Sequence, residues 1–169
     1  MDKTRALERL AKQIRKSKKC RLSKSATHAV PGEGPANAKI MIIGAAPGKM
    51  EDLTGRPFVG KAGKYLTRLL KDIGLLRNKV FMTSVEKYYP PANRAPKKDE
   101  IKACKPYLLS QIAIIKPKIV VLLGKTAESL KNEIKAKHII ITVHPAAAMR
   151  FPKMNKKFRQ DIKKLKKLI

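Results

Sequence analysis

Residues 40–63 read I-M-I-I-G-A-A-P-G-K-M-E-D-L-T-G-R-P-F-V-G-K-A-G, an apolar run that passes directly into a loop rich in glycine and proline. A second stretch has the same plan, because the strand-like run at 139–142 is followed by the loop V-H-P-A-A-A-M-R at 143–150. Short apolar runs bounded by turn residues are typical of buried strands. We therefore expect each loop to follow a strand, and the two loops to form two halves of one site.

Around these stretches, apolar runs alternate with helical patterns. In sequence order, the runs and patterns occupy 38–43, 61–73, 79–85, 98–115, 118–123, 125–134 and 138–143. Strands that alternate with helices predict a parallel sheet covered on both faces and joined by right-handed crossovers. The expected fold class is α/β, a three-layer α/β/α sandwich with a four-stranded parallel sheet. Ligands bind such sheets at the carboxyl ends of the strands, the edge from which both loops would leave.

The length of 169 residues, 43% of them apolar, suits one domain with a buried core. We expect a single domain over 1–169 that begins and ends with basic amphipathic helices, at 1–19 and 152–169. No stretch approaches the roughly 18 consecutive apolar residues of a membrane span, and the N-terminus lacks the apolar centre of a secretion signal. The sequence thus predicts an intracellular monomer, cytoplasmic or associated with the nucleoid, with no membrane partner.

The charge is strongly unbalanced. Lysine and arginine number 40 against 12 acidic residues, a formal net charge of +28. Such an excess favours an anionic partner, and nucleic acid is the obvious one. Residues 1–24 carry ten basic and two acidic side chains, and residues 149–169 carry nine and one, a net +8 for each segment. Two readings stay open: a footprint for nucleic acid, or a lysine-rich surface that only keeps the protein in solution.

Two familiar nucleotide-binding motifs are excluded. Gly124-Lys125-Thr126 ends like a phosphate-binding loop, but Ile119 stands where the first glycine of that motif is required. Gly32-x-Gly34 follows no expected strand and lacks a third glycine, so it is no dinucleotide fingerprint.

Further segments accompany the two loops. They are C-R-L-S-K at 20–24, V-P-G-E-G at 30–34, V-F-M-T-S-V at 80–85, P-P-A-N-R-A-P at 90–96, E-I-K-A-C-K-P-Y-L at 100–108 and K-P-K-I-V-V-L-L-G at 116–124. Together with the loops they resemble the uracil-DNA glycosylase superfamily, closest to its thermostable iron–sulfur branch, family 4. The resemblance implies an enzyme of base-excision repair that flips a deaminated base, above all uracil, out of DNA and hydrolyses its N-glycosidic bond. DNA with damaged bases would be its partner.

Cleavage of that bond builds positive charge on the sugar and negative charge on the departing base. Backbone N–H groups of the first loop, with Ala45 and Ala46 as catalytic candidates, can donate to the developing anion. Gly44 and Gly48 would let the base approach closely, and Pro47 would keep the loop stiff, which makes these three candidates for base binding.

His144 opens the second loop and is the first candidate to donate a hydrogen bond to a carbonyl of the base as charge develops there. A structural histidine is the alternative, but the following Pro145 matches the H-P-x-x motif of the superfamily. The resemblance assigns Phe58 to stacking on the base, which is worth about 1–3 kcal/mol per base. Its alternative is a place in the core, where most phenylalanines lie.

Glu51 and Asp52 form an acid pair within basic surroundings. By resemblance, Glu51 shapes the pocket and helps to position water or to stabilise the sugar cation, while Asp52 braces the loop. Ion pairs with Arg56 or Lys49 are the alternative, and surface pairs contribute little.

The resemblance to family 4 implies a four-iron cluster on four cysteines. This chain has Cys20 and Cys104, with Ser17 and Tyr88 at the other two ligand positions. Two thiolates do not complete the usual set, so the expectation at this point is that no metal and no other cofactor is bound. The two cysteines would then be buried thiols, or a disulfide that an intracellular compartment disfavours.

Two departures from family 4 fall on the base site. Ala45 stands in place of a glutamate, as in the broad-specificity family 5, and Ser84 stands in place of a base-reading asparagine. A serine hydroxyl offers one donor, and losing a paired contact to a buried base costs about 1–3 kcal/mol of discrimination. The alternatives are therefore a DNA-binding paralogue with weak or no catalysis, or one with altered base specificity. An RNA-binding module would leave the paired loops unexplained.

The last departure concerns the DNA face. Ala148 stands where relatives often have a leucine wedge, so Met149 or Arg150 would fill the gap left by the flipped nucleotide. Contacts to phosphate position the protein but read no sequence. The candidates for these contacts are Arg94, Lys125, Thr126, Arg150 and Lys153.

Overall fold

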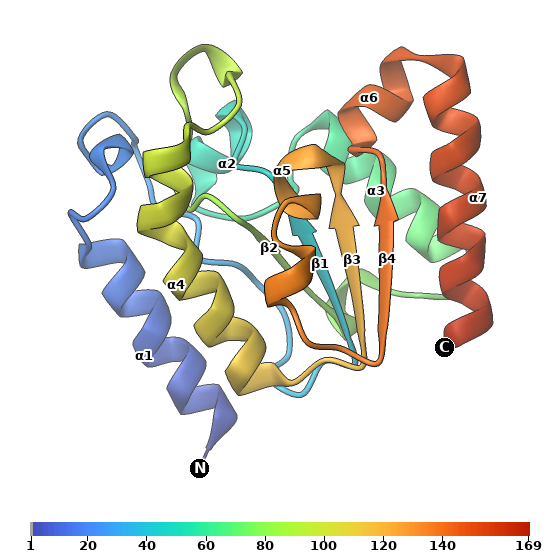
Figure 1. Ribbon diagram of the computed structural model, residues 1–169, viewed down its shortest axis with the longest axis horizontal. Helices are drawn as coiled ribbons and strands as arrows, with labels where there is room; N and C mark the ends of the chain where they lie inside the picture. Colours follow the sequence, from blue (N-terminus) through green and yellow to red (C-terminus); the bar gives the residue numbers. More distant parts are fainter. Residues whose placement is uncertain (1) are drawn as a thin grey trace.

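A computed structural model describes residues 2–169 and contains one parallel sheet of four strands (Figure 1). The strands are β1 (Ile40–Gly44), β2 (Val80–Ser84), β3 (Ile119–Leu123) and β4 (His138–Thr142). They lie in the order β2-β1-β3-β4, so β1 and β3 occupy the centre. The first residues of neighbouring strands are paired, as Ile40 is with both Val80 and Ile119. The predicted four-stranded parallel sheet is confirmed.

Helices cover both faces of the sheet. They are α1 (Lys3–Lys16), α2 (Lys49–Thr54), α3 (Lys61–Asp72), α4 (Lys98–Ile115), α5 (Gly124–Glu128), α6 (Pro145–Arg150) and α7 (Pro152–Leu168), with short 3₁₀ turns at Arg21–Lys24, Arg77–Lys79, Pro91–Asn93 and Lys131–Glu133. Figure 1 shows α3, α6 and α7 on one side of the sheet and α1, α4 and α5 on the other. The α/β/α sandwich is therefore confirmed as well.

Side chains of a strand alternate between the two faces, and this divides the core in two. Ile40 and Ile42 of β1 pack with α3 and α7, whereas Met41 and Ile43 pack with α4 and α5. The N-terminal helix α1 lies against α4, outside the sheet (Figure 1). No helix within residues 2–169 combines the length and the apolarity needed to cross a membrane.

The structure differs from the sequence-based expectation in its short elements. The helix expected at 125–134 is only the five-residue α5 followed by a 3₁₀ turn, and α2 and α6 fall inside the two loops. Segments of five or six residues are too short to show a helical period. The stretch 22–38, which precedes β1, is tied to the sheet because Glu33 forms an antiparallel bridge with Met82 of β2.

Candidate active site

A cavity of about 480 Å³ opens at the carboxyl ends of the strands. Its lining comes from Val30, residues 45–51, Pro57, Phe58, residues 60–63, Ser84, residues 93–96, His144 and Ala146. The two signature loops thus meet, as predicted, at the edge drawn uppermost in Figure 1. A larger hollow of about 690 Å³ lies at the opposite edge, beside the first residues of the strands, and contains none of the predicted catalytic or base-binding residues.

Phe58 forms one wall of the cavity. Its ring lies so close to β1 that a Cβ on Gly44 would come within 2.8 Å of the ring's Cζ, which explains the glycine at the end of this strand. Phe58 is 8% exposed and belongs to the core that packs against α3. Phe58 is therefore both a core residue and a wall of the cavity. One part of its ring is packed, and the side chain still lines the cavity.

The backbone of Phe58 is held in an unusual conformation, with φ at +50°. Such values cost about 1–3 kcal/mol in residues other than glycine and persist where the surroundings enforce them. Arg77 does so here, because its guanidinium donates to the carbonyl of Phe58 at 2.6 Å and to that of Pro57. Gly63 allows the close approach of α3, since a Cβ there would lie 2.1 Å from the Phe58 carbonyl carbon. Sequence reasoning missed Arg77, because one arginine among 40 basic residues gives no signal.

Glu51 joins the two halves of the first loop. One carboxylate oxygen accepts from the N–H of Gly48 at 3.0 Å, and the other accepts from the N–H groups of Val59 and Gly60 at 2.7 and 2.6 Å. Within residues 2–169, Glu51 is also the one acidic side chain that lines the cavity. Its negative charge therefore lies at the site while its hydrogen bonds hold the loop.

Asp52 points away from the cavity. Its Oδ1 accepts from the N–H groups of Thr27 and His28 at 2.8 and 3.3 Å, so it ties α2 to the stretch before β1. The alternative pairing with Arg56 is not found, because Arg56 forms its ion pair with Glu33 at 2.7 Å.

His144 is the N-cap residue of α6, and its orientation is set by that helix. Nδ1 accepts a hydrogen bond from the N–H of Ala146 at 3.1 Å, so a neutral ring carries its proton on Nε2. Burial lowers the pKa of His144 below its ordinary value of 6.5, and the charge of Glu51 only partly opposes this. The ring is therefore a neutral donor at neutral pH. Its centroid lies 6.5 Å from that of Phe58, with the planes 26° apart.

The amides of the first loop are not all free. The N–H of Gly48 is used by Glu51, and Pro47 has none, so Ala45 and Ala46 are the loop residues whose N–H groups can serve as donors. The carbonyl of Ala45 accepts from the N–H of Glu86 at 3.0 Å, which fixes this part of the loop to the segment after β2.

Ser84 ends β2 at the floor of the cavity and is buried. Behind it lies Lys87, which is fully buried and whose ammonium donates to the Ser84 carbonyl at 2.6 Å, to Thr83 Oγ1 at 2.6 Å and to Gln111 Oε1 at 2.9 Å. Burial lowers the pKa of Lys87 to about 7. Sequence reasoning missed this lysine as well, since nothing distinguishes it from its many exposed neighbours.

The residues predicted to contact DNA lie near the same edge, with one exception. Arg94 lines the cavity and is held by two hydrogen bonds to Glu100, at 2.8 and 2.9 Å. Lys125, Arg150 and Lys153 are exposed, and Thr126 is half-buried. Ala148 is 2% exposed and packs in the core, so its assignment to the DNA face is wrong. The helical turn of α6 points it inward and leaves Met149 on the surface, 50% exposed.

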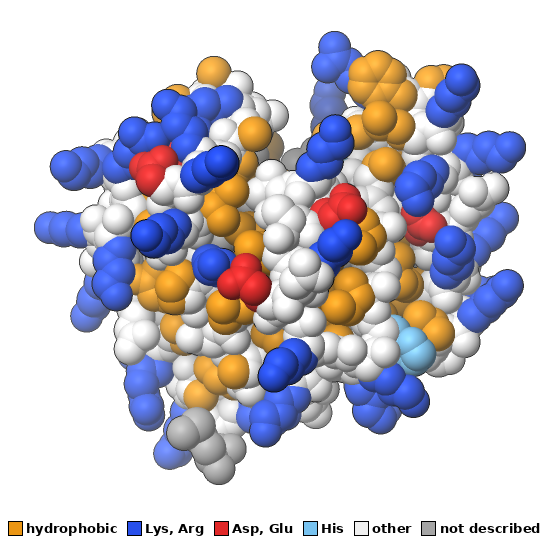
Figure 2. Space-filling view, viewed as in Figure 1, with side chains coloured by type: hydrophobic (Ala, Val, Ile, Leu, Met, Phe, Trp, Pro, Cys, Tyr) orange, Lys and Arg blue, Asp and Glu red, His pale blue; other side chains and the backbone are white. Residues whose placement is uncertain are grey.

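Figure 2 shows lysine and arginine side chains spread over the visible face, with acidic ones few and scattered. Acidic side chains of the described residues are also partly neutralised by ion pairs, as Glu33 is with Arg56 and Glu100 with Arg94. The visible face therefore favours a polyanion.

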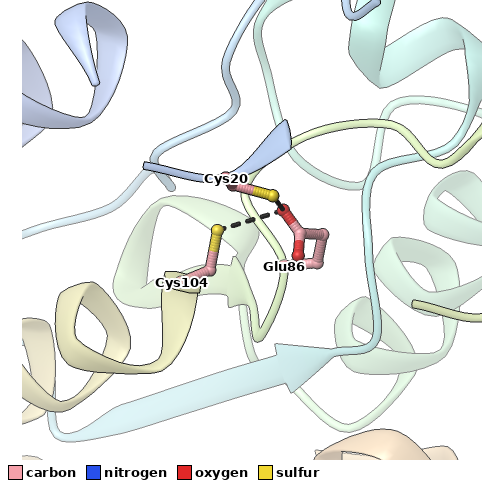
Figure 3. A group of neighbouring side chains, drawn as sticks. All are labelled: Cys20, Glu86 and Cys104. Atoms are coloured by element: carbon pink, nitrogen blue, oxygen red, sulfur yellow. Dashed lines mark hydrogen bonds between the residues drawn. The ribbon is translucent and has the colours of Figure 1, made fainter. Parts of the chain in front are cut away.

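A second group of reactive side chains lies outside the cavity. Cys20, Glu86 and Cys104 are all buried, and one ligand atom from each lies within 4.8 Å of the others (Figure 3). Both thiols are free and donate to Glu86 Oε1, from 3.4 Å for Cys20 and 3.0 Å for Cys104. The prediction that the chain binds no metal is wrong on this ground, because it considered two cysteines alone and missed the carboxylate that makes them a group able to hold a metal ion.

The residues at the two remaining cluster positions are engaged elsewhere. Tyr88 donates to the carbonyl of Ile14 at 2.7 Å, and Ser17 Oγ accepts from the hydroxyl of Tyr107 at 2.7 Å. The side chains present therefore do not reproduce a four-cysteine ligand set.

Comparisons with known proteins identify the same family that the residues around the cavity resemble. The family model described as the uracil DNA glycosylase superfamily matches residues 31–166. The chain is 45% identical to the type-4 uracil-DNA glycosylase of Sulfurisphaera tokodaii, over 96% of this chain and 84% of that protein. It is 36% identical to the type-4 enzyme of Thermotoga maritima, over 96% and 94%. The resemblance of this chain to type 4 is what implied an iron–sulfur cluster. The similarity to these two type-4 enzymes therefore further contradicts the expectation that no cofactor is bound. The chain belongs to the uracil-DNA glycosylase superfamily.

Proposed function

We propose that this protein removes uracil from DNA by hydrolysing the N-glycosidic bond, and that the cavity at the carboxyl edge of the sheet is the uracil site. The observation that carries the proposal is the convergence of Phe58, His144 and the 45–48 loop on one cavity. Similarity to type-4 uracil-DNA glycosylases over nearly the whole chain supports the same activity. We further propose that the protein acts as a monomer on the nucleoid.

Binding begins with the base leaving the stack, which costs a few kcal/mol. The ring of Phe58 offsets part of this cost, because stacking contributes about 1–3 kcal/mol per base. Met149 is exposed at the end of α6 and is the side chain suited to enter the space left in the duplex.

Bond breaking leaves negative charge on the base and positive charge on the sugar. His144 donates from Nε2 to a carbonyl oxygen of the base, and the N–H groups of Ala45 and Ala46 donate from the loop. These donors are fixed before the reaction by α6 and by the contact between Ala45 and Glu86, so little reorganisation is needed.

Glu51 acts on the sugar rather than on the base. Both of its oxygens already accept backbone N–H groups, so it is poorly placed to take a proton from water. Its charge instead favours the sugar cation. With no other carboxylate in the described lining of the cavity, the reaction proceeds by departure of the base as an anion and capture of the sugar cation by water, whose released proton ends on the base.

A second proposal concerns which bases this site accepts. Ala45 and Ser84 both line the cavity at places where family 4 is expected to carry glutamate and asparagine. Because one hydroxyl cannot donate and accept as an amide does, hypoxanthine or xanthine competes with uracil more easily than in an asparagine site.

The test uses duplex and single-stranded oligonucleotides that carry uracil, hypoxanthine or xanthine. Abasic sites are cleaved with alkali after incubation and the products are separated by electrophoresis. We expect product from uracil DNA, with the His144→Ala protein as control and circular dichroism to confirm that both are folded. No product above this control on any lesion would leave only DNA binding, and product from hypoxanthine or xanthine alone would establish the altered specificity.

A further inference from the structure

The group of Cys20, Glu86 and Cys104 brings together three distant parts of the chain. Cys20 lies in the segment after α1, Glu86 follows β2, and Cys104 lies in α4, and Figure 3 shows both sulfur atoms directed at one carboxylate. Their exposed fractions are 2%, 0% and 0%. A carboxylate in such a place is costly unless it is matched by positive charge or by hydrogen bonds.

The hydrogen bonds around Glu86 are unevenly divided. Oε1 accepts from both thiols and from the N–H groups of Lys87 and Tyr88, at 3.1 and 3.2 Å. Oε2 is buried and has no partner among the described residues. One oxygen is therefore crowded with donors and the other has none. A cation coordinated by the carboxylate would satisfy the second oxygen.

The donor set and its spacing suit a single ion. Zinc prefers thiolate sulfur at about 2.3 Å and carboxylate oxygen at about 2.0–2.2 Å, which places the ligand atoms of a tetrahedral site roughly 3.5 Å apart. The two sulfur-to-oxygen distances, 3.4 and 3.0 Å, are close to this spacing. Two thiolates and a carboxylate that binds through both oxygens supply four donor atoms. A cubane cluster instead needs four separate ligands, and the side chains of Ser17 and Tyr88 are hydrogen-bonded elsewhere.

We propose that Cys20, Glu86 and Cys104 bind a single thiophilic divalent cation, with zinc as the expected metal and Glu86 as a protein ligand. Both thiols lose their protons to solvent when the ion binds. The ion joins the segment after α1 to α4 and to the segment after β2. Because the N–H of Glu86 holds the carbonyl of Ala45, this site also braces the floor of the uracil cavity.

The first experiment uses the wild-type protein and the metal alone. We expect one zinc per chain by elemental analysis, without acid-labile sulfide. After removal of the metal by a chelator, added Co²⁺ should give the thiolate charge-transfer band and the intense visible bands of a tetrahedral site, and Zn²⁺ should abolish them. Iron with acid-labile sulfide would overturn the single-ion site, and so would a protein that holds no zinc and shows no cobalt spectrum.

The second experiment tests the role of Glu86. Glu86→Gln keeps the shape of the side chain but removes its charge, and we expect the cobalt bands to be lost or to shift strongly. Tyr88→Phe is the matched control, because it removes a buried hydroxyl two residues away that is not a ligand, and its spectrum should equal that of the wild type. An unchanged spectrum in folded Glu86→Gln would contradict the assignment of Glu86. The wild-type spectrum decides the existence of the site even if the variants fold poorly.

Discussion

At the residue scale, Phe58 shows how the site is held in place. Its positive φ is unfavourable by itself, and Arg77 maintains it through hydrogen bonds to the carbonyls of Phe58 and Pro57. The stacking wall therefore depends on a guanidinium that does not itself line the cavity.

We predict that Arg77→Met lowers the free energy of unfolding by about 1–3 kcal/mol, because buried carbonyls lose their donors. Uracil excision should slow as well, since the ring of Phe58 is no longer fixed. Denaturant unfolding and single-turnover excision measure the two effects. Arg77→Lys is the control for charge: it keeps the cation but cannot bridge two carbonyls, so it should resemble Arg77→Met. Full activity in both variants would show that Arg77 does not position the ring.

His144 gives the protein a defined response to acid. Burial lowers its pKa below 6.5 in the folded state, so as the pH falls the unfolded chain binds a proton first. The free energy of unfolding should therefore decrease as the pH falls through this region. The variant His144→Asn does not titrate and keeps a side chain that caps α6 well.

We predict that the wild type loses more stability than His144→Asn between about pH 7.5 and about pH 5.5, the range in which histidine titrates. Urea unfolding at both pH values measures this, and taking the difference between the proteins cancels the contribution of all other groups. Equal losses would mean that His144 is not buried as a neutral ring.

At the scale of elements, Glu51 makes α2 and the start of α3 a single unit. It accepts the N–H of Gly48 before α2 and the N–H groups of Val59 and Gly60 before α3. The α2 helix has only six residues and could not hold the loop by itself.

We predict that Glu51→Gln lowers stability by about 1–3 kcal/mol and slows excision, because an amide cannot accept at both ends. Affinity for undamaged DNA should be unchanged. Asp52→Asn is the matched control, since its one remaining oxygen can still accept from Thr27 and His28, and it should have the smaller effect. Binding by fluorescence anisotropy and excision rates separate the outcomes, and a larger effect of Asp52→Asn would contradict the role of Glu51.

The long elements could be predicted from the sequence, and the short ones could not. The sheet and the helices α3, α4 and α7 follow from apolar periodicity, and the meeting of both loops follows from parallel strands. The helix α6 spans only residues 145–150, so the inward position of Ala148 could not be foreseen. Glu86 was missed for another reason: metal ligands are recognised by spacing, and a single acid far from either cysteine has none.

At the scale of the whole molecule, the net positive charge determines how the protein binds DNA. The net charge of +28 has two explanations, a footprint or a soluble surface, and the helix α7 allows a direct comparison. Its 17 residues extend for about 25 Å, so Lys153 in its first turn, like Arg150 at the end of α6, lies near the cavity edge, while Lys166 and Lys167 lie at the far end.

We predict that replacing Arg150 and Lys153 by glutamine weakens DNA binding and reduces the slope of log K against log salt by about 2, one for each lost phosphate contact. Replacing Lys166 and Lys167 removes the same charge and should leave the slope nearly unchanged. Anisotropy titrations at several salt concentrations measure both. Equal effects would mean that the charge acts only as a diffuse field.

The most direct test of the proposed uracil site is a crystal structure of the protein with free uracil, a product of the proposed reaction. We expect uracil in the cavity at the carboxyl edge of the sheet, with its ring on Phe58 and a carbonyl oxygen within hydrogen-bond distance of His144 Nε2. Uracil bound in the hollow at the opposite edge, or in this cavity without contact to either residue, would contradict it.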